Sequence, residues 1–277
     1  MLLRTLVKHI ENILPPETAM EGDRIGLQID SDKREISDIL VSLELTDEVI
    51  DEALKLNSDC VVVFHPLIFM PLKNIRFDER VGRLVSKLIK NDIALISVHT
   101  AYDAFYEGTN KILADLLELK ITGNLVPDKK HENFGMGVIA EASKSLKPEE
   151  LLNKVHNICR SPLKFTEGAS EKISKVVIVG GSGSSFMGDA LKSGADAFIT
   201  ADITYHTFHA VKGKIWLIDP GHYELEQFVG KGIAKLLKAK LGNELKSITA
   251  SKTHTNPVGY FPDSGKYREL QKELLIK

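Results

Sequence analysis

Three histidines in this sequence stand where apolar segments end. His65, His99 and His222 each follow closely on a run rich in Val, Ile or Leu. Asp103 comes four residues after His99, and Glu226 comes four residues after His222. Imidazoles combined with carboxylates and no thiolates suit zinc, iron, manganese or nickel, in an open site of the catalytic type. The sequence therefore predicts that these five residues are metal ligands.

The apolar segments are typical of buried strands, and their ends are typical places for ligands. Val61–Phe64 runs directly into His65, and Pro66 restricts the backbone after it. In open α/β sheets, ligands collect outside the carboxyl ends of the strands. The simpler interpretation of His65 alone is that it caps a strand and hydrogen-bonds a loop. The His99–Asp103 and His222–Glu226 pairs favour the metal site, because residues four apart on a helix share a face.

Strand patterns alternate with helical patterns along the chain, which predicts mainly parallel sheets. We expect two α/β domains with mainly parallel or mixed sheets flanked by helices, and a metal site between them. A polar segment near 127–133 marks the boundary, with residues 1–127 in the first domain and 128–226 in the second. The C-terminal stretch 227–277, which begins with a long amphipathic helix, is expected to pack back on the first domain.

Two further features leave alternatives open. Residues 180–185 read Gly-Gly-Ser-Gly-Ser-Ser after a predicted strand at 176–179. Such a loop is either a phosphate cradle or a tight strand-to-helix turn, and it lacks the lysine of a nucleotide P-loop. His206 follows the next predicted strand, at 197–200, and is a general acid or base, a ligand or a surface residue.

Composition excludes some classes of protein. The 277 residues include 36 Lys plus Arg and 38 Asp plus Glu, so no overall basic field is available to hold nucleic acid. No apolar run approaches the ~20 residues that span a bilayer. Cys60 and Cys159 belong to no Cys-x-x-Cys pair, and we expect no signal peptide. We therefore expect a cytoplasmic protein with reduced thiols and with neither a membrane nor a nucleic-acid partner.

Several segments together resemble the NGG-one-interacting-factor-three-like family, whose members are also called type-two GTP cyclohydrolase I homologues or dinuclear metal centre proteins. The resemblance covers nearly the whole chain, and its motifs occur in the family's order. They are Gly26-Leu27-Gln28, Val41–Thr46, Val49–Ala53, His65-Pro66-Leu67-Ile68-Phe69, His99-Thr100 with Asp103 and Gly108, Thr200–His206, and Gly221-His222-Tyr223 with Glu226.

The resemblance implies a two-metal centre in one pocket and a ring-shaped homohexamer. The implied ligands are the five that the residues themselves predict, His65, His99, Asp103, His222 and Glu226. Phe64 stands where the family has the first of two adjacent histidines, so we expect one or two divalent ions (Zn, Fe, Mn or Ni) in each subunit. The sequence also departs from the family pattern at Gly22, Glu44 and Ala201.

Two functions of different classes follow. The first is a metal-dependent hydrolase, with Glu226 or His206 carrying the proton and, by the family's name alone, a purine nucleotide as substrate. The second is a metal-binding ring or interaction protein without turnover, which the absent histidine at position 64 favours. Fold and family do not determine chemistry, so both remain open at this stage.

Overall fold

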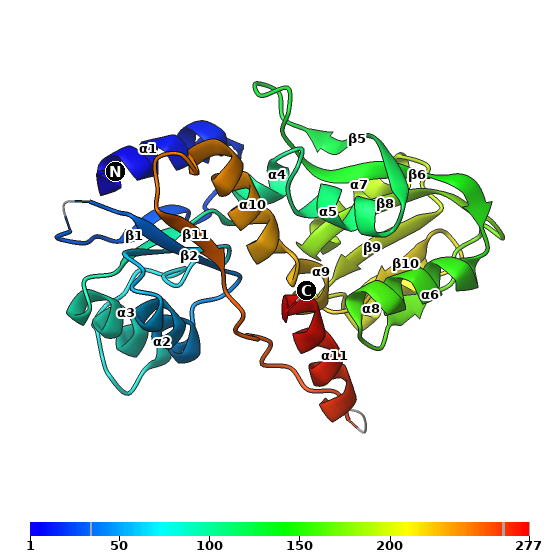
Figure 1. Cartoon of the computed structure of the whole chain (residues 1–277). Coiled ribbons are helices and arrows are strands. Elements are labelled where there is room, and N and C mark those ends of the chain that lie inside the picture. The colour runs from blue at the N-terminus through cyan, green and yellow to red at the C-terminus, as the bar shows by residue number, and fades with distance from the viewer. Residues whose placement is uncertain (34, 262–263, 277) are drawn as a thin grey trace. The chain divides into compact units, whose positions relative to one another are not determined.

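The computed structural model describes residues 1–33, 35–261 and 264–276. The chain forms two compact α/β units (Figure 1). Unit 1 consists of Met1–Tyr102 and Val229–Thr255, and unit 2 of Asp103–Phe228 and Asn256–Lys277. The division falls within helix α4 (His99–Ala104). The predicted fold class of two helix-flanked sheets is confirmed.

Unit 1 is built on a five-stranded sheet in the order β1-β4-β3-β2-β11. Its four adjacent strands β4, β3, β2 and β11 run parallel, and β1 pairs antiparallel with β4 at one edge. The three central strands β2, β3 and β4 are buried along their whole length, as expected of a sheet covered on both faces. The strands are β1 (Gly26–Ile29), β2 (Asp38–Ser42), β3 (Cys60–Val63), β4 (Ala94–Ser97) and β11 (Ser247–Ala250).

Helices cover both faces of this sheet. Figure 1 shows α2 and α3 on one face and α1 and α10 on the other. Thr46 caps α2, where its hydroxyl oxygen accepts a hydrogen bond from the Val49 amide at 3.3 Å. Val49, Ile50 and Ala53 then form the buried stripe of that helix. The elements are α1 (Leu3–Ile13), the 3-10 turn η1 (Pro16–Thr18), α2 (Asp47–Lys55), α3 (Arg80–Lys90) and α10 (Val229–Leu241).

Unit 2 is built on a six-stranded mixed sheet in the order β5-β6-β8-β9-β10-β7. Strands β8, β9 and β10 are parallel, while β5, β6 and the edge strand β7 add antiparallel pairs. The strands are β5 (Leu119–Pro127), β6 (Gly135–Leu146), β7 (Lys164–Thr166), β8 (Ile173–Ser182), β9 (Ala197–Ala201) and β10 (Trp216–Asp219).

Alternation along the central strand divides the core of unit 2 into two layers. Val176 and Ile178 pack with α5 and α6, whereas Val177 and Val179 pack with α7 and α8 on the other face. The helices are α5 (Thr109–Leu116), α6 (Pro148–Cys159), the 3-10 turn η2 (Ser184–Phe186), α7 (Met187–Lys192), α8 (Tyr205–Val211), α9 (His222–Glu226) and α11 (Ser264–Ile276).

The units differ from the predicted domain limits. Residues 119–127, which the predicted limits place in the first domain, form strand β5, which pairs with β6 and so belongs to the second sheet. A register shift between Ile121 and Gly123 breaks the apolar alternation that would have marked this strand. At the other end, 229–255 belongs to unit 1, but 256–277 belongs to unit 2.

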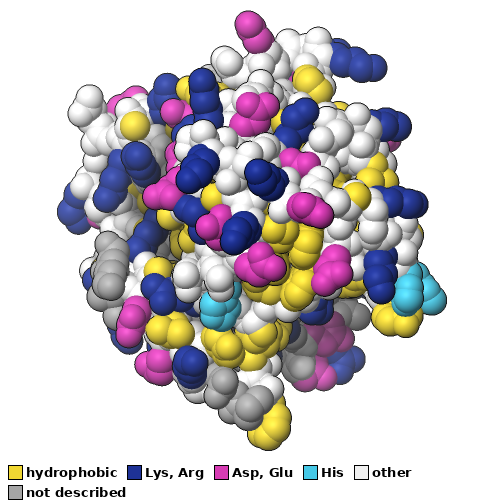
Figure 2. Space-filling view, turned by 90° about the vertical axis from the view of Figure 1, so that its right-hand side faces the viewer, with side chains coloured by type: hydrophobic (Ala, Val, Ile, Leu, Met, Phe, Trp, Pro, Cys, Tyr) yellow, Lys and Arg dark blue, Asp and Glu magenta, His cyan; other side chains and the backbone are white. Residues whose placement is uncertain are grey.

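The surface carries charges of both signs. Acidic and basic side chains are interspersed on the face drawn in Figure 2, in keeping with their nearly equal numbers in the sequence. Among the described residues, none of the helices has the length and apolar character needed to cross a bilayer.

Candidate metal-ligating residues

In unit 1, His65 lies just beyond the end of β3 beside a carboxylate. Its Nδ1 lies 2.9 Å from Oε1 of Glu44, a residue that follows the end of the neighbouring parallel strand β2. An Nδ1–H that donates to a carboxylate leaves the lone pair of the ring on Nε2. Glu44 is itself held 3.7 Å from the guanidinium of Arg80. The pair therefore fixes both the orientation and the tautomer of this imidazole, as a metal ligand requires.

His99 has the same arrangement at the start of α4. Its Nδ1 lies 2.8 Å from Oδ1 of Asp23, and the other oxygen of Asp23 accepts hydrogen bonds from the amide and hydroxyl of Thr100. Burial alone would raise the pKa of Asp23, but the hydrogen bonds from His99 and Thr100 outweigh it and lower the pKa to about 2. Asp23 is therefore ionised and holds His99 by a charged acceptor.

Phe64, the residue that replaces a family histidine, packs the two unit 1 imidazoles together. It is fully buried, and its ring centroid lies 4.9 Å from that of His65 and 5.3 Å from that of His99. The His65 and His99 centroids are 5.2 Å apart. A benzene ring has no atom that binds a metal, so this position contributes packing and the unit supplies two imidazoles.

In unit 2, His222 and Glu226 lie one turn apart on α9, as predicted. His222 Nδ1 lies 2.7 Å from Oδ2 of Asp202, and its Nε2 lies 3.0 Å from Oε2 of the buried Glu226. Burial lowers the pKa of His222, but the hydrogen bonds and charges of Glu226 and Asp202 outweigh it and raise the pKa to about 9. In the metal-free protein, Nε2 of His222 therefore carries a proton that lies between this nitrogen and the Glu226 carboxylate. A metal cation would take the same position.

Gly181 makes room for the Glu226 carboxylate. Its φ is +61°, and a Cβ built on it would lie 2.2 Å from Oε1 of Glu226 and 3.3 Å from Nε2 of His222. The glycine-rich segment thus lies against a carboxylate, and Gly180 and Gly181 are still part of β8. The close approach explains why a residue without a side chain stands here.

We expect Gly181→Ala to weaken metal binding by at least about tenfold, because the new methyl group must displace Glu226. The measurement is a calorimetric titration with Zn²⁺. Gly194→Ala controls for backbone strain, since Gly194 also has a positive φ (+69°) but nothing within 4 Å of its Cβ position. Equal metal affinity in the two variants would contradict the role of Gly181.

Asp103 and His206 complete the predicted set. Asp103 is buried on α4, and its carbonyl oxygen accepts a hydrogen bond from Nδ2 of Asn110 at 3.0 Å. Oδ1 of the same Asn110 accepts from the Gly180 amide at 2.9 Å, so Asn110 ties α4 to β8 beside Gly181. His206 lies exposed on α8, where its ring contacts Tyr205. Its proton-transfer role stays a prediction.

The structure brings the predicted residues together in two subsets. Unit 1 places His65 beside His99, and unit 2 places His222 beside Glu226. Sequence reasoning missed the carboxylates that orient the imidazoles, which are Glu44, Asp23 and Asp202. Glu44 comes two residues after the end of β2 and Asp202 directly after the end of β9, and these positions are visible in the sequence. Asp202 also has a φ of +56°, which the sequence does not reveal.

A fourth acidic residue, Glu224, anchors α9 from its other side. Its side chain is almost fully buried, and Oε1 accepts hydrogen bonds from Asn256 Nδ2 at 2.8 Å and from Gln271 Nε2 at 3.0 Å. The hydroxyl of Tyr260 also donates to Glu224; burial, followed by the charge of Glu224, raises the pKa of that hydroxyl. The C-terminal segment therefore holds the short helix that carries His222 and Glu226.

Comparison with known proteins agrees with this fold. The family described as Duf34/NIF3 (NGG1p interacting factor 3) matches residues 1–257. A Clostridium perfringens protein named GTP cyclohydrolase 1 type 2 homolog is 32% identical over 254 residues, covering 90% of this chain and 96% of that protein. A Streptococcus pneumoniae protein of the same name is 33% identical over 271 residues, covering 93% and 98%.

Solved structures resemble the chain over most of its length. Staphylococcus aureus hypothetical protein SA1388 superposes with a TM-score of 0.85 at 26% identity, covering 94% of this chain and 99% of that one. Reduced HcgD from Methanocaldococcus jannaschii gives a TM-score of 0.72 at 26% identity, covering 91% and 97%. The resemblance drawn from the motifs is confirmed: the chain belongs to the Duf34/NIF3 (NGG1p interacting factor 3) family.

Proposed function

We propose that this protein binds divalent transition metal ions through His65 and His99 in unit 1 and through Asp103, His222 and Glu226 in unit 2. One observation supports this most directly. Each of the three histidines has Nδ1 within 2.9 Å of a carboxylate oxygen, from Glu44, Asp23 and Asp202 respectively. Metal-ligating histidines nearly always donate their second ring N–H to such a group, because it fixes the ring and raises its basicity.

The donor set fits the proposed ions. Imidazole nitrogen with carboxylate oxygen suits Zn²⁺, Fe²⁺, Mn²⁺ or Ni²⁺, and neither of the two buried cysteines belongs to the proposed ligand set. A bound ion of this kind supplies a Lewis acid that polarises a carbonyl or phosphoryl oxygen. Phe64 provides no ligand atom, so five ligands remain. Five ligands are compatible with one or two ions per subunit.

We further propose that the metal-binding protein is a hydrolase, with a purine nucleotide as the substrate class. The relatives named GTP cyclohydrolase 1 type 2 homolog support the substrate class by analogy alone. Within the chain, Asp202 holds His222 in place, and Glu226 is the first candidate to accept and return a proton because it is buried beside that ring. His206 is the second candidate.

Metal analysis and turnover test the two parts separately. Protein purified without added metal should contain one or two equivalents of a transition metal by elemental analysis. Hydrolysis of GTP and of a phosphodiester, assayed with Mn²⁺, Zn²⁺ and Fe²⁺, should fall in Asp103→Ala and Glu226→Ala. Metal bound without turnover would favour the alternative, a non-catalytic metal-binding or interaction protein. Turnover that is unchanged in both variants would exclude these residues from catalysis.

Metal binding should release a proton and strengthen as the pH rises. Because the pKa of His222 is raised from 6.5 to about 9, metal-free protein carries a proton there at neutral pH, and a cation must displace it. The proton stabilises the metal-free fold below about pH 6.5, and this contribution is lost as the pH rises through about 9. Zn²⁺ affinity should therefore rise by up to about tenfold per pH unit across this window.

Calorimetry in buffers of different ionisation enthalpy counts the released protons. Glu226→Gln keeps the size of the side chain but removes its charge, so it should bring the pKa of His222 down and reduce the proton release at neutral pH. A Zn²⁺ affinity that does not change with pH in the wild-type protein would contradict the assignment of His222.

We also propose that the protein assembles as a homo-oligomer, with a toroidal hexamer as the form that the family resemblance implies. Native mass spectrometry at several protein concentrations tests this. A monomer at every concentration would exclude it.

A further inference from the structure

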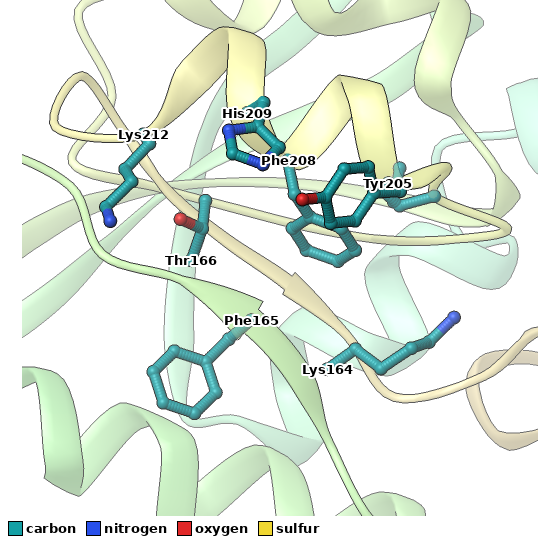
Figure 3. A pocket seen from close by; sticks show the side chains of 8 residues that line it. Lys164, Phe165, Thr166, Tyr205, Phe208, His209 and Lys212 are labelled. Carbon is teal, nitrogen blue, oxygen red and sulfur yellow. The ribbon is translucent and has the colours of Figure 1, made fainter.

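A pocket in unit 2 lies between helix α8 and the edge strand β7 (Figure 3). Its volume is about 580 Å³, within the range of about 300–1,000 Å³ that is usual for small-molecule sites. The floor is apolar, because Ile203 is buried and Phe208 is partly buried in the layer that covers this face of the sheet. The Phe165 side chain turns to the opposite face, where it stacks on Trp216.

Aromatic rings from α8 form one wall of this α8–β7 pocket. Tyr205 leaves 71% of its surface exposed, so most of this side chain is open to a ligand. Its ring centroid lies 4.6 Å from that of His209, at an interplanar angle of 70°. Tyr205, Phe208 and His209 therefore present ring faces and edges against which a flat ligand can stack.

The pocket is electropositive. Lys164 and Lys212 lie at its two ends in Figure 3, and none of the residues that line it is acidic. Lys164 Nζ is paired with Oδ2 of the buried Asp219 at 2.6 Å, which fixes this lysine in place. Lys212 has no ion-pair partner among the described residues. One ammonium group is thus held by the protein, and the other is available to a ligand anion.

We propose that the α8–β7 pocket binds a nucleoside monophosphate, in which an aromatic base and a phosphate are joined through a sugar. The ring lies against Tyr205 and Phe208, and the phosphate lies at Lys212. Stacking on exposed aromatic side chains is favourable for every base, and a lysine binds phosphate as a point charge. None of the residues that line the pocket is a proposed metal ligand, so this site works independently of the metal ions.

Calorimetric titration and saturation-transfer NMR with AMP test the proposal. AMP should bind saturably, and adenosine and inorganic phosphate should each bind more weakly, because each lacks half of the recognised chemistry. Tyr205→Ala and Lys212→Glu should each weaken AMP binding by about tenfold. The matched controls Tyr106→Ala and Lys144→Glu change an exposed tyrosine and an exposed lysine of the same unit and should leave the affinity unchanged.

Four outcomes would overturn the proposal. The first is the absence of saturable AMP binding, and the second is AMP affinity that does not change in both Tyr205→Ala and Lys212→Glu. The third is a short oligodeoxythymidylate that binds more tightly than AMP, which would assign the pocket to single-stranded nucleic acid. Titration after treatment with EDTA separates this site from the metal ions. Unchanged affinity supports an independent pocket, and lost affinity, the fourth outcome, would place AMP on the metal instead.

Discussion

His222→Ala should abolish tight metal binding in unit 2, whereas Asp202→Asn should only weaken it. The alanine variant removes a ligand atom, so its loss should exceed the about 10- to 100-fold that follows when a residue that merely orients a ligand is changed. Asp202→Asn preserves shape, and asparagine tolerates the positive φ of 56° at this position, so the backbone should stay in place. Competition with a chromogenic zinc chelator measures both affinities.

A matched control shows whether the loss of metal binding is specific to His222 or follows from the removal of any histidine in unit 2. His131 is another histidine of unit 2 that is paired with a carboxylate, with Nδ1 3.1 Å from Oδ1 of Asp128, but it lies in the 127–133 segment and is not a predicted metal ligand. His131→Ala should therefore retain full metal affinity. If it loses as much metal as His222→Ala, the assignment of His222 is wrong. Metal content of His65→Ala, alone and combined with His222→Ala, then reports how many ions depend on each histidine.

The ligand candidates could be predicted because they follow a simple rule of parallel sheets. His65, His99 and His222 come after β3, β4 and β10, which are strands whose residues are mostly apolar and buried in the structure. The spacing of four between His222 and Glu226 matches the short helix α9. A histidine that interrupts the end of an apolar run is visible in the sequence without knowledge of the neighbouring strands.

The residues that orient these ligands depend on strand order, which the sequence does not display. Asp23 precedes β1, which runs antiparallel to β4 with Gly26 opposite Ser97. This pairing brings the segment before β1, and Asp23 with it, to the carboxyl end of β4. Strand β7 is not visible in the sequence, because its three residues, Lys-Phe-Thr, are too few to show the alternation of apolar and polar side chains. Strand β5 is not visible because a register shift interrupts this alternation. Each of these features depends on pairing between distant segments.

Gln271→Glu should destabilise unit 2 and weaken metal binding together. The substitution keeps the size of the side chain but replaces a donor 3.0 Å from Glu224 with a second carboxylate in a buried site. Loss of a hydrogen bond to a buried charged group alone costs about 1–3 kcal/mol in the free energy of unfolding, and repulsion adds to this. Because Glu224 lies between His222 and Glu226 on α9, any shift of its side chain moves both ligands.

The pH dependence of this variant distinguishes repulsion from a simple loss of packing. A second buried carboxyl group must hold a proton to fit beside Glu224, so its pKa in the folded protein is raised. The variant should therefore regain stability as the pH falls towards about 4.3, the ordinary pKa of glutamate, and lose it as the pH rises. Gln271→Leu, which adds no charge, should show a loss that does not depend on pH in this way, as measured by urea denaturation midpoints.

Metal affinity decides whether the C-terminal segment acts on the ligands or only on the stability of the fold. Residue 271 lies beyond the 257 residues that match the family, yet its amide contacts the helix that carries His222 and Glu226. Under conditions where both variants are fully folded, Gln271→Leu should bind Zn²⁺ more weakly than Glu273→Leu, which changes an exposed residue of the same helix. Equal Zn²⁺ affinities would restrict Gln271 to a structural role, whereas a weaker affinity in Gln271→Leu alone means that this chain uses its C-terminal helix to hold metal ligands.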